Sequence, residues 1–217
     1  MLKVNFEKHS GGASKILCIG AHSDDIEIGC GGTILRLLAE KKDVELTWVV
    51  FCADGRRGAE AEKSAGMFLK NAKKKKTEIL AFRDGFLPYE GPTLKEYFER
   101  MKETVRPDII FTHYRHDLHQ DHRLISELTW NTYRDHLILE YEIIKYDGDL
   151  GTPNCYVHLD AATCEKKIAL IRTCFNTQKA KAWFSDDTFY SILRLRGVES
   201  NAPGRYAEGF YARKIIF

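Results

Sequence analysis

Short apolar runs that alternate with helical patterns limit the folds open to this chain more than any other feature of its sequence. The runs are rich in β-branched and aromatic residues and lie at residues 15–21, 44–52, 77–82 and 108–112, which predicts four strands. The intervals between them are long enough for helices, and parallel strands need crossover connections of that length. The sequence therefore predicts the α/β class, with a Rossmann-like, mostly parallel sheet that has helices on both faces.

The pattern changes after about residue 136. Residues 137–146 and 206–217 favour strands, whereas residues 161–175 and 178–195 favour helices. No internal repeat or long linker interrupts the sequence, and 217 residues are typical of one domain. We therefore expect a single domain over residues 1–217, with a Rossmann-like core at about 14–136 and appended strands and helices at about 137–217.

The charge balance gives no support for a nucleic-acid partner. Lys and Arg number 33 against 31 Asp and Glu, a formal net charge of +2, so the whole protein has no strong field to attract polyanions. Four lysines at residues 73–76 lie between a predicted helix and a predicted strand, where a run of charge is typical of a solvated turn. We expect no nucleic acid among the partners.

The cysteines and the apolar pattern predict a cytoplasmic protein. Six cysteines occur without a C-x-x-C pair, and several lie in apolar runs where cysteine behaves as a small hydrophobic residue. The N-terminal residues lack the apolar stretch of a signal peptide, and no run approaches the roughly 18 apolar residues of a membrane span. We therefore expect a reducing compartment and no membrane insertion.

Two clusters of acidic residues and histidines follow the first and the fourth predicted strands. The first carries His22, Asp24, Asp25 and Glu27, and the second reads His-Gln-Asp-His at residues 119–122. In the common strand order 3-2-1-4, strands one and four are neighbours whose carboxyl ends open onto one crevice. The clusters supply nitrogen and oxygen ligands and a nearby carboxylate, as a catalytic zinc site requires. We predict a metal-dependent hydrolase with its catalytic site at the carboxyl ends of these two strands.

These motifs resemble the signature of the LmbE/PIG-L-type N-deacetylases, which is [AP]-H-x-D-D-x-E, then G-G, and later H-x-D-H. In this chain the three parts lie at residues 21–27, 31–32 and 119–122. Ser23 and Gln120 stand where the family usually has proline, and neither change removes a ligand or a catalytic group. The resemblance extends over nearly the whole chain, through Arg57-x-x-Glu60, Asp84-Gly85, Arg106-Pro107-Asp108, Arg196-Gly197 and Ala207-Glu208-Gly209-Phe210.

The resemblance implies roles for six residues of the two clusters. Asp24 is the implied general base, and His119, paired with Asp121, handles the developing charge and the leaving group. Two adjacent aspartates cannot both point comfortably at one cation from a turn, so one can bind the metal while the other accepts a proton. The implied zinc ligands are His22, Asp25 and His122.

Three further residues belong to the expected site, and two histidines are left open. We expect Glu27 in the second shell, where it orients the loop by hydrogen bonding to His22 or to the backbone. The family implies that Arg57 and Asp84 contact substrate, because a guanidinium and a carboxylate suit sugar hydroxyls; an ordinary ion pair is the alternative. His113 and His116 lie on the loop that leads into the second motif, and a contact with substrate is left open for both.

The glycine-rich turn at residues 29–32 raises dinucleotide binding as an alternative. The fingerprint G-x-G-x-x-G fails in detail, because His22 follows Gly20-Ala21 where the second glycine is required. Acidic side chains would also occupy the space of the pyrophosphate. We therefore set this alternative aside.

The resemblance implies a zinc-dependent hydrolase that removes the N-acetyl group from an amino sugar, a nucleotide sugar or another amino-sugar conjugate. It also implies a homo-oligomer of undefined size. Iron or another divalent metal could occupy the same ligands. Hydrolysis of a different N-acyl group, a non-catalytic sugar-binding protein and a two-metal phosphoesterase are the alternatives.

Overall fold

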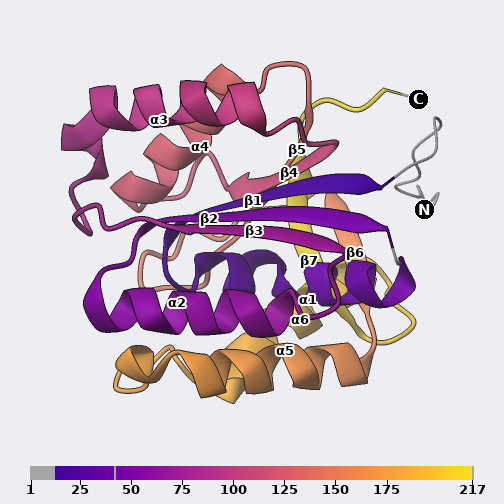
Figure 1. The fold of residues 1–217 in the computed structure, drawn as a ribbon. Helices are drawn as coiled ribbons and strands as arrows, with labels where there is room; N and C mark the ends of the chain where they lie inside the picture. The colour runs from indigo at the N-terminus through magenta and orange to yellow at the C-terminus, as the bar shows by residue number, and fades with distance from the viewer. Residues whose placement is uncertain (1–12, 42, 217) are drawn as a thin grey trace.

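Seven strands form one mixed sheet in the part of the chain that the computed structural model describes, residues 13–41 and 43–216 (Figure 1). Their order across the sheet is β3-β2-β1-β4-β5-β7-β6. Neighbouring strands from β3 to β5 are parallel, whereas β7 is antiparallel to both β5 and β6. The predicted α/β class with a mostly parallel sheet is confirmed. The strands are β1 (Ser14–His22), β2 (Val44–Cys52), β3 (Lys74–Ile79), β4 (Ile109–His113), β5 (Leu137–Tyr141), β6 (Cys155–Leu159) and β7 (Tyr206–Ala212).

The later strands differ more from the sequence prediction than β1, β2 and β4 do. β5 ends at Tyr141 and β7 ends at Ala212, so both are shorter than predicted. β6 was not predicted, because only its last residue, Leu159, is fully buried and the strand lacks a continuous apolar run. β5 pairs in parallel with β4, with Ile109 opposite Leu137. The sheet therefore continues across residue 136.

Helices connect the strands as the alternating pattern predicted. The main departure is α6, which begins at Asp186 although residues 178–195 favoured a helix. Ser185 is its N-cap and accepts the N–H of Thr188 at 3.2 Å, and two aspartates occupy the first turn, where they interact favourably with the helix dipole. Among the described helices, none is long and apolar enough to cross a membrane. The helices are α1 (Asp25–Glu40), α2 (Gly55–Phe68), η1 (Leu87–Glu90), α3 (Gly91–Thr104), α4 (Gln120–Thr132), α5 (Ala161–Cys174), η2 (Asn176–Gln178) and α6 (Asp186–Glu199).

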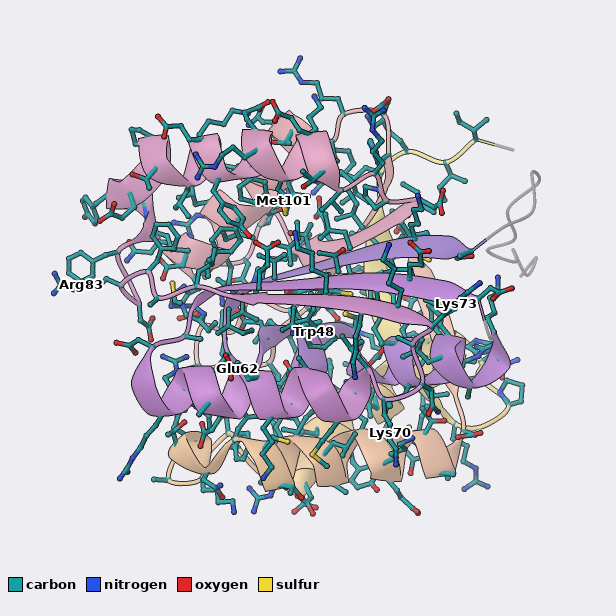
Figure 2. The ribbon with its side chains drawn as sticks, viewed as in Figure 1. Trp48, Glu62, Lys70, Lys73, Arg83 and Met101 are labelled. Carbon is teal, nitrogen blue, oxygen red and sulfur yellow. The ribbon has the colours of Figure 1, made fainter. Side chains whose placement is uncertain are left out.

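Helices cover both faces of the sheet and divide the core into two layers (Figure 1). α3 and α4 lie on one face, α1 and α2 lie on the other, and α5 packs against α1 and α2 from outside. Side chains along β1 alternate between the two layers, with Cys18 in one and Ile19 in the other. Figure 2 shows Trp48 and Met101 on opposite sides of the sheet, one in each layer.

The lysine run at residues 73–76 does not form the solvated turn that we expected. Its last three residues form the first half of β3, an edge strand with exposed side chains there. Lys73 contacts Asp43 at 2.9 Å and Lys76 contacts Glu78 at 2.6 Å. Charged side chains on an edge strand oppose pairing with other chains, so these lysines have a structural explanation that needs no polyanion.

Candidate metal and active site

Neighbouring parallel strands bring the two sequence clusters to one edge of the sheet. β1 ends at His22 and β4 ends at His113, and the two strands pair directly. α1 begins at Asp25 immediately after the first cluster, and α4 begins at Gln120 within the second. Figure 2 shows Arg83, which follows β3, at this same carboxyl edge. The two sequence clusters therefore lie together at the carboxyl edge of the sheet, as the strand order predicted.

Three buried atoms from the predicted ligands face one another. Nδ1 of His22 lies 3.1 Å from Nε2 of His122 and 3.3 Å from Oδ2 of Asp25. The third pair, Nε2 of His122 and Oδ2 of Asp25, is 3.5 Å apart. Ligands at 2.0–2.1 Å from a tetrahedral zinc ion are about 3.3 Å from each other. The three atoms thus fit three vertices of one such site and leave the fourth open.

Two further histidines border this triad. His113, which the sequence left open, is fully buried; its Nε2 lies 3.1 Å from Oδ2 of Asp25 and accepts the N–H of Ala21 at 2.9 Å. Its ring stacks on that of His122. His116 is exposed and packs edge-on against Tyr114. Among the described residues, three further combinations could also hold a metal ion: His22/His119/His122, Asp25/His113/His122 and His22/Asp84/His119/Asp121.

The outer nitrogen of each candidate histidine ligand faces a carboxylate. Nδ1 of His122 lies 3.0 Å from Oδ2 of Asp117, and Nε2 of His22 lies 3.2 Å from Oδ2 of Asp121 and 3.1 Å from Oδ1 of Asp84. Such carboxylates hold the ring proton on the outer nitrogen, which leaves the inner nitrogen free to bind a metal. Sequence reasoning missed Asp117, although its place on the loop that leads into α4, five residues before His122, was a usable signal.

We expected the Asp121 carboxylate to pair with His119, but in the structure it does not. The carboxylate lies against His22 and also accepts the N–H groups of Gly85 at 2.7 Å and Leu87 at 3.1 Å. Only the backbone N–H of Asp121 contacts His119, donating to Nδ1 at 3.3 Å. The reason is that α4 begins at Gln120, so the Asp121 side chain, in the first turn, points back toward β1 and the loop after β3.

Asp24 and Glu27 are buried carboxyls with different surroundings. Oδ2 of Asp24 has no hydrogen-bond partner among the described residues, and burial together with the neighbouring Asp25 raises the pKa of Asp24 to about 6. Glu27 does not contact His22, because it lies two helical positions beyond Asp25 and faces Ser64 on α2. Burial raises the pKa of Glu27 well above its usual range.

Arg57 and Asp84 form an ion pair at the rim of the site. Nη1 of Arg57 donates to Oδ2 of Asp84, and its Nε lies 3.4 Å from the Ser23 hydroxyl. The hydrogen bond with His22 lowers the pKa of Asp84, whose side chain is 51 % exposed. The ion pair that we considered as the alternative is therefore formed. Contact with substrate stays a prediction for both residues.

Together, the fold and the cluster define an α/β protein with a candidate catalytic metal centre at the carboxyl ends of β1 and β4. The family model of PIG-L, described as GlcNAc-PI de-N-acetylase, matches residues 17–133, which is more than half of the chain. The chain belongs to this deacetylase family, as the motifs indicated.

Solved structures share this fold over almost the whole chain. The N,N'-diacetylchitobiose deacetylase from Pyrococcus horikoshii is 25% identical, with a TM-score of 0.67 over 93% of this chain and 84% of that one. A teicoplanin deacetylase, solved in a zinc-inhibited form, is 10% identical, with a TM-score of 0.70 over 92% and 97%. The 4-carboxy-2-hydroxymuconate hydratase GalB from Pseudomonas putida KT2440 is 17% identical, with a TM-score of 0.74 over 94% and 98%. The last two, below 25% identity, show the fold alone.

Proposed function

We propose that this protein is a metal-dependent N-deacetylase that releases acetate from an N-acetylated amino sugar or amino-sugar conjugate. The observation that carries the proposal is the triad of His22, Asp25 and His122, with donor atoms 3.1–3.5 Å apart, beside an oxygen of Asp24 that has no partner among the described residues. Two imidazoles and one carboxylate suit zinc, and iron is the alternative metal. A bound zinc ion would act as a Lewis acid that polarises the amide carbonyl and makes water more acidic.

Asp24 is suited to act as the general base. It is the residue directly before α1 and is almost fully buried beside the triad. Its Oδ2 has no partner in residues 13–41 and 43–216, so this oxygen is free to accept a proton. A pKa of about 6 lies near physiological pH, where a general base combines availability with proton affinity. Asp25, in contrast, accepts the N–H of His22 at 2.6 Å and is held in the ligand position.

His119 is suited to donate a proton to the departing amine. Its Nδ1 accepts the backbone N–H of Asp121, so the proton of the neutral ring resides on Nε2. The ring is half-buried and lies 4.8 Å from the ring of His22 and 4.6 Å from that of His122, measured between centroids. From this place Nε2–H can donate a hydrogen bond to a developing oxyanion. When the ring carries protons on both nitrogens, it can give one proton to the departing amine and return to the neutral imidazole.

The sugar part of the proposal rests on the family and on the rim of the site. The family description names an N-acetylglucosaminyl lipid, and the Pyrococcus horikoshii relative is a deacetylase of an N-acetylated disaccharide. Arg57 and Asp84 border the site and offer a donor and an acceptor for hydroxyl groups. A free sugar, a nucleotide sugar and a larger conjugate share the group that reacts. The cytoplasmic location and the homo-oligomer remain predictions.

Acetate release from zinc-loaded protein tests the proposal against a panel of N-acetylated sugars and nucleotide sugars. Wild type should release acetate, whereas Asp24→Asn should retain the metal and lose at least about a hundredfold in rate, the usual contribution of a general base. Asp187→Asn, an exposed change on α6, is the matched control. Near-normal turnover by Asp24→Asn would remove Asp24 from this role. Metal binding without acetate release from any substrate would favour another acyl group or a sugar-binding protein.

A further inference from the structure

Lys145 lies next to the candidate metal site although it is outside the segment that the family model matches. It belongs to the connection between β5 and β6, and its side chain is only 11% exposed. Its ammonium group lies 3.0 Å from Oδ2 of Asp117 and 2.5 Å from Oδ2 of Asp149. Both carboxylates are almost completely buried. A buried cation from the β5–β6 connection therefore lies between two buried anions, against the loop that leads to α4.

Asp117 links this cation to two proposed functional residues. Its Oδ2, which contacts Lys145, also accepts Nδ1–H of His122 at 3.0 Å. Its Oδ1 accepts the backbone N–H of His119 at 2.8 Å. One carboxylate thus contacts both the proposed metal ligand and the loop position of the proposed proton donor.

Asp149 attaches the same loop to the connection after β5. Its Oδ2 accepts the backbone N–H of Leu118 at 2.7 Å in addition to the contact with Lys145. Asp147 is two residues away, yet it lies 3.9 Å from the ammonium group and its side chain is 40% exposed. Asp147 is therefore a suitable control position, because it lies near Lys145 but is more exposed and more distant than Asp149.

We propose that Lys145 is a positioning residue for the metal ligand His122, acting through Asp117. The ammonium group compensates the buried carboxylates and holds Oδ2 of Asp117 against Nδ1 of His122. The imidazole then keeps its proton on Nδ1 and presents Nε2 to the triad. The inference rests on the proposed function, because it requires His122 to be a metal ligand. It also gives the segment after β5 a part in the metal site.

Zinc affinity, measured by competition with a chromogenic chelator, tests this role. Lys145→Met should weaken zinc binding by about tenfold, the lower end of the effect of losing a carboxylate that contacts a metal ligand directly, because Lys145 acts through Asp117. Lys145→Arg, which keeps a cation, should recover most of the affinity, and Asp147→Asn should match wild type. If Lys145→Met does not fold, Lys145→Gln retains a donor for Asp117, and it should show a smaller loss than the tenfold expected for Met.

The visible spectrum of the cobalt-substituted protein separates positioning from a purely structural role. Loss of Lys145 should shift or weaken the ligand-field bands because the His122 ring is no longer held, whereas Lys145→Arg and Asp147→Asn should reproduce the wild-type bands. An affinity within about twofold of wild type and an unchanged spectrum in Lys145→Met, or in Lys145→Gln in its place, would overturn the inference. His122→Ala tests the proposed ligand set separately. If this variant retains wild-type zinc affinity, His122 is not a metal ligand, and the proposed role of Lys145 fails with it.

Discussion

The substitution Lys167→Met should destabilise the protein strongly although it lies on α5, away from the candidate site. Nζ of Lys167 lies 2.6 Å from Oε1 of Glu208 and donates to the carbonyl oxygen of Ile28 at 2.7 Å. Glu208 on β7 also accepts the backbone N–H groups of Gly32 at 2.8 Å and Thr33 at 2.6 Å. Both charged side chains are almost fully buried. The pair therefore connects α1, α5 and β7.

Removal of the lysine leaves the Glu208 charge buried without its cation and the Ile28 carbonyl without this donor. Breaking a buried ion pair from one side costs about 3–5 kcal/mol. For a chain of this size each kcal/mol shifts Tm by about 2–4 °C. We therefore expect Tm to fall by roughly 6–20 °C. Lys167→Met combined with Glu208→Gln removes both charges and should recover part of the loss.

Thermal unfolding followed by circular dichroism measures this effect, with the metal chelated so that ligand binding does not contribute. Lys95→Met is the matched control, because Lys95 pairs with Glu99 on the exposed face of α3 and water screens such a pair. Its Tm should stay close to that of wild type. The reasoning is refuted if Lys167→Met and Lys95→Met lower Tm equally, or if the double variant is no more stable than Lys167→Met.

Two further predictions concern packing and thiol chemistry. Gly197→Ala should destabilise the protein by about 1–3 kcal/mol, because a Cβ there would lie 2.1 Å from the backbone oxygen of Arg205. A Cβ at the exposed Gly66 on α2 would meet nothing within 4 Å, so Gly66→Ala should stabilise the protein by about 0.5–1 kcal/mol. Equal unfolding curves for the two variants would contradict this reasoning. Cys155 is the half-buried thiol and the other five cysteines are buried, so a thiol-specific reagent should modify one cysteine of the native protein and none in Cys155→Ser. Burial raises the pKa of Cys155, so labelling should accelerate as pH rises and the thiolate fraction grows; modification of several thiols under native conditions would count against this burial pattern.

The sequence predicted the catalytic edge because two rules that act at different levels agree. The apolar runs indicate the strands, and the rule that parallel strands share their carboxyl edge places His22 and His122 at one edge of the sheet from the sequence alone. The resemblance then assigned roles within that edge. What the sequence could not predict is which carboxylate each histidine contacts, because the partner depends on how helix starts orient side chains. Asp121 contacts His22 for this reason, whereas Asp117 contacts His122.

Side-chain contacts between residues far apart in the chain also could not be predicted from local sequence patterns. Lys145 reads as a loop lysine in a segment that contains several acids, and only the fold places its ammonium group against Asp117. The Ala207-Glu208-Gly209-Phe210 run resembles a family feature, but its local sequence offers no physical reason for it. The structure supplies the reason, because Glu208 accepts two backbone N–H groups from the middle of α1 and pairs with Lys167.

The glycines of α1 show how a motif can mislead when it is separated from its packing. A Cβ on Gly29 would lie 2.2 Å from the ring of Tyr141, and one on Gly32 would lie 2.5 Å from the side chain of Leu159. The hydroxyl of Tyr141 in turn donates to the carbonyl oxygen of Ile19 on β1 at 2.7 Å. The glycines thus allow α1 to approach β5 and β6 closely. Because Asp25 is the first residue of α1, this close approach fixes the position of a proposed metal ligand. The glycine-rich sequence, which the structure places inside α1 and not in a turn, needs no phosphate to explain it.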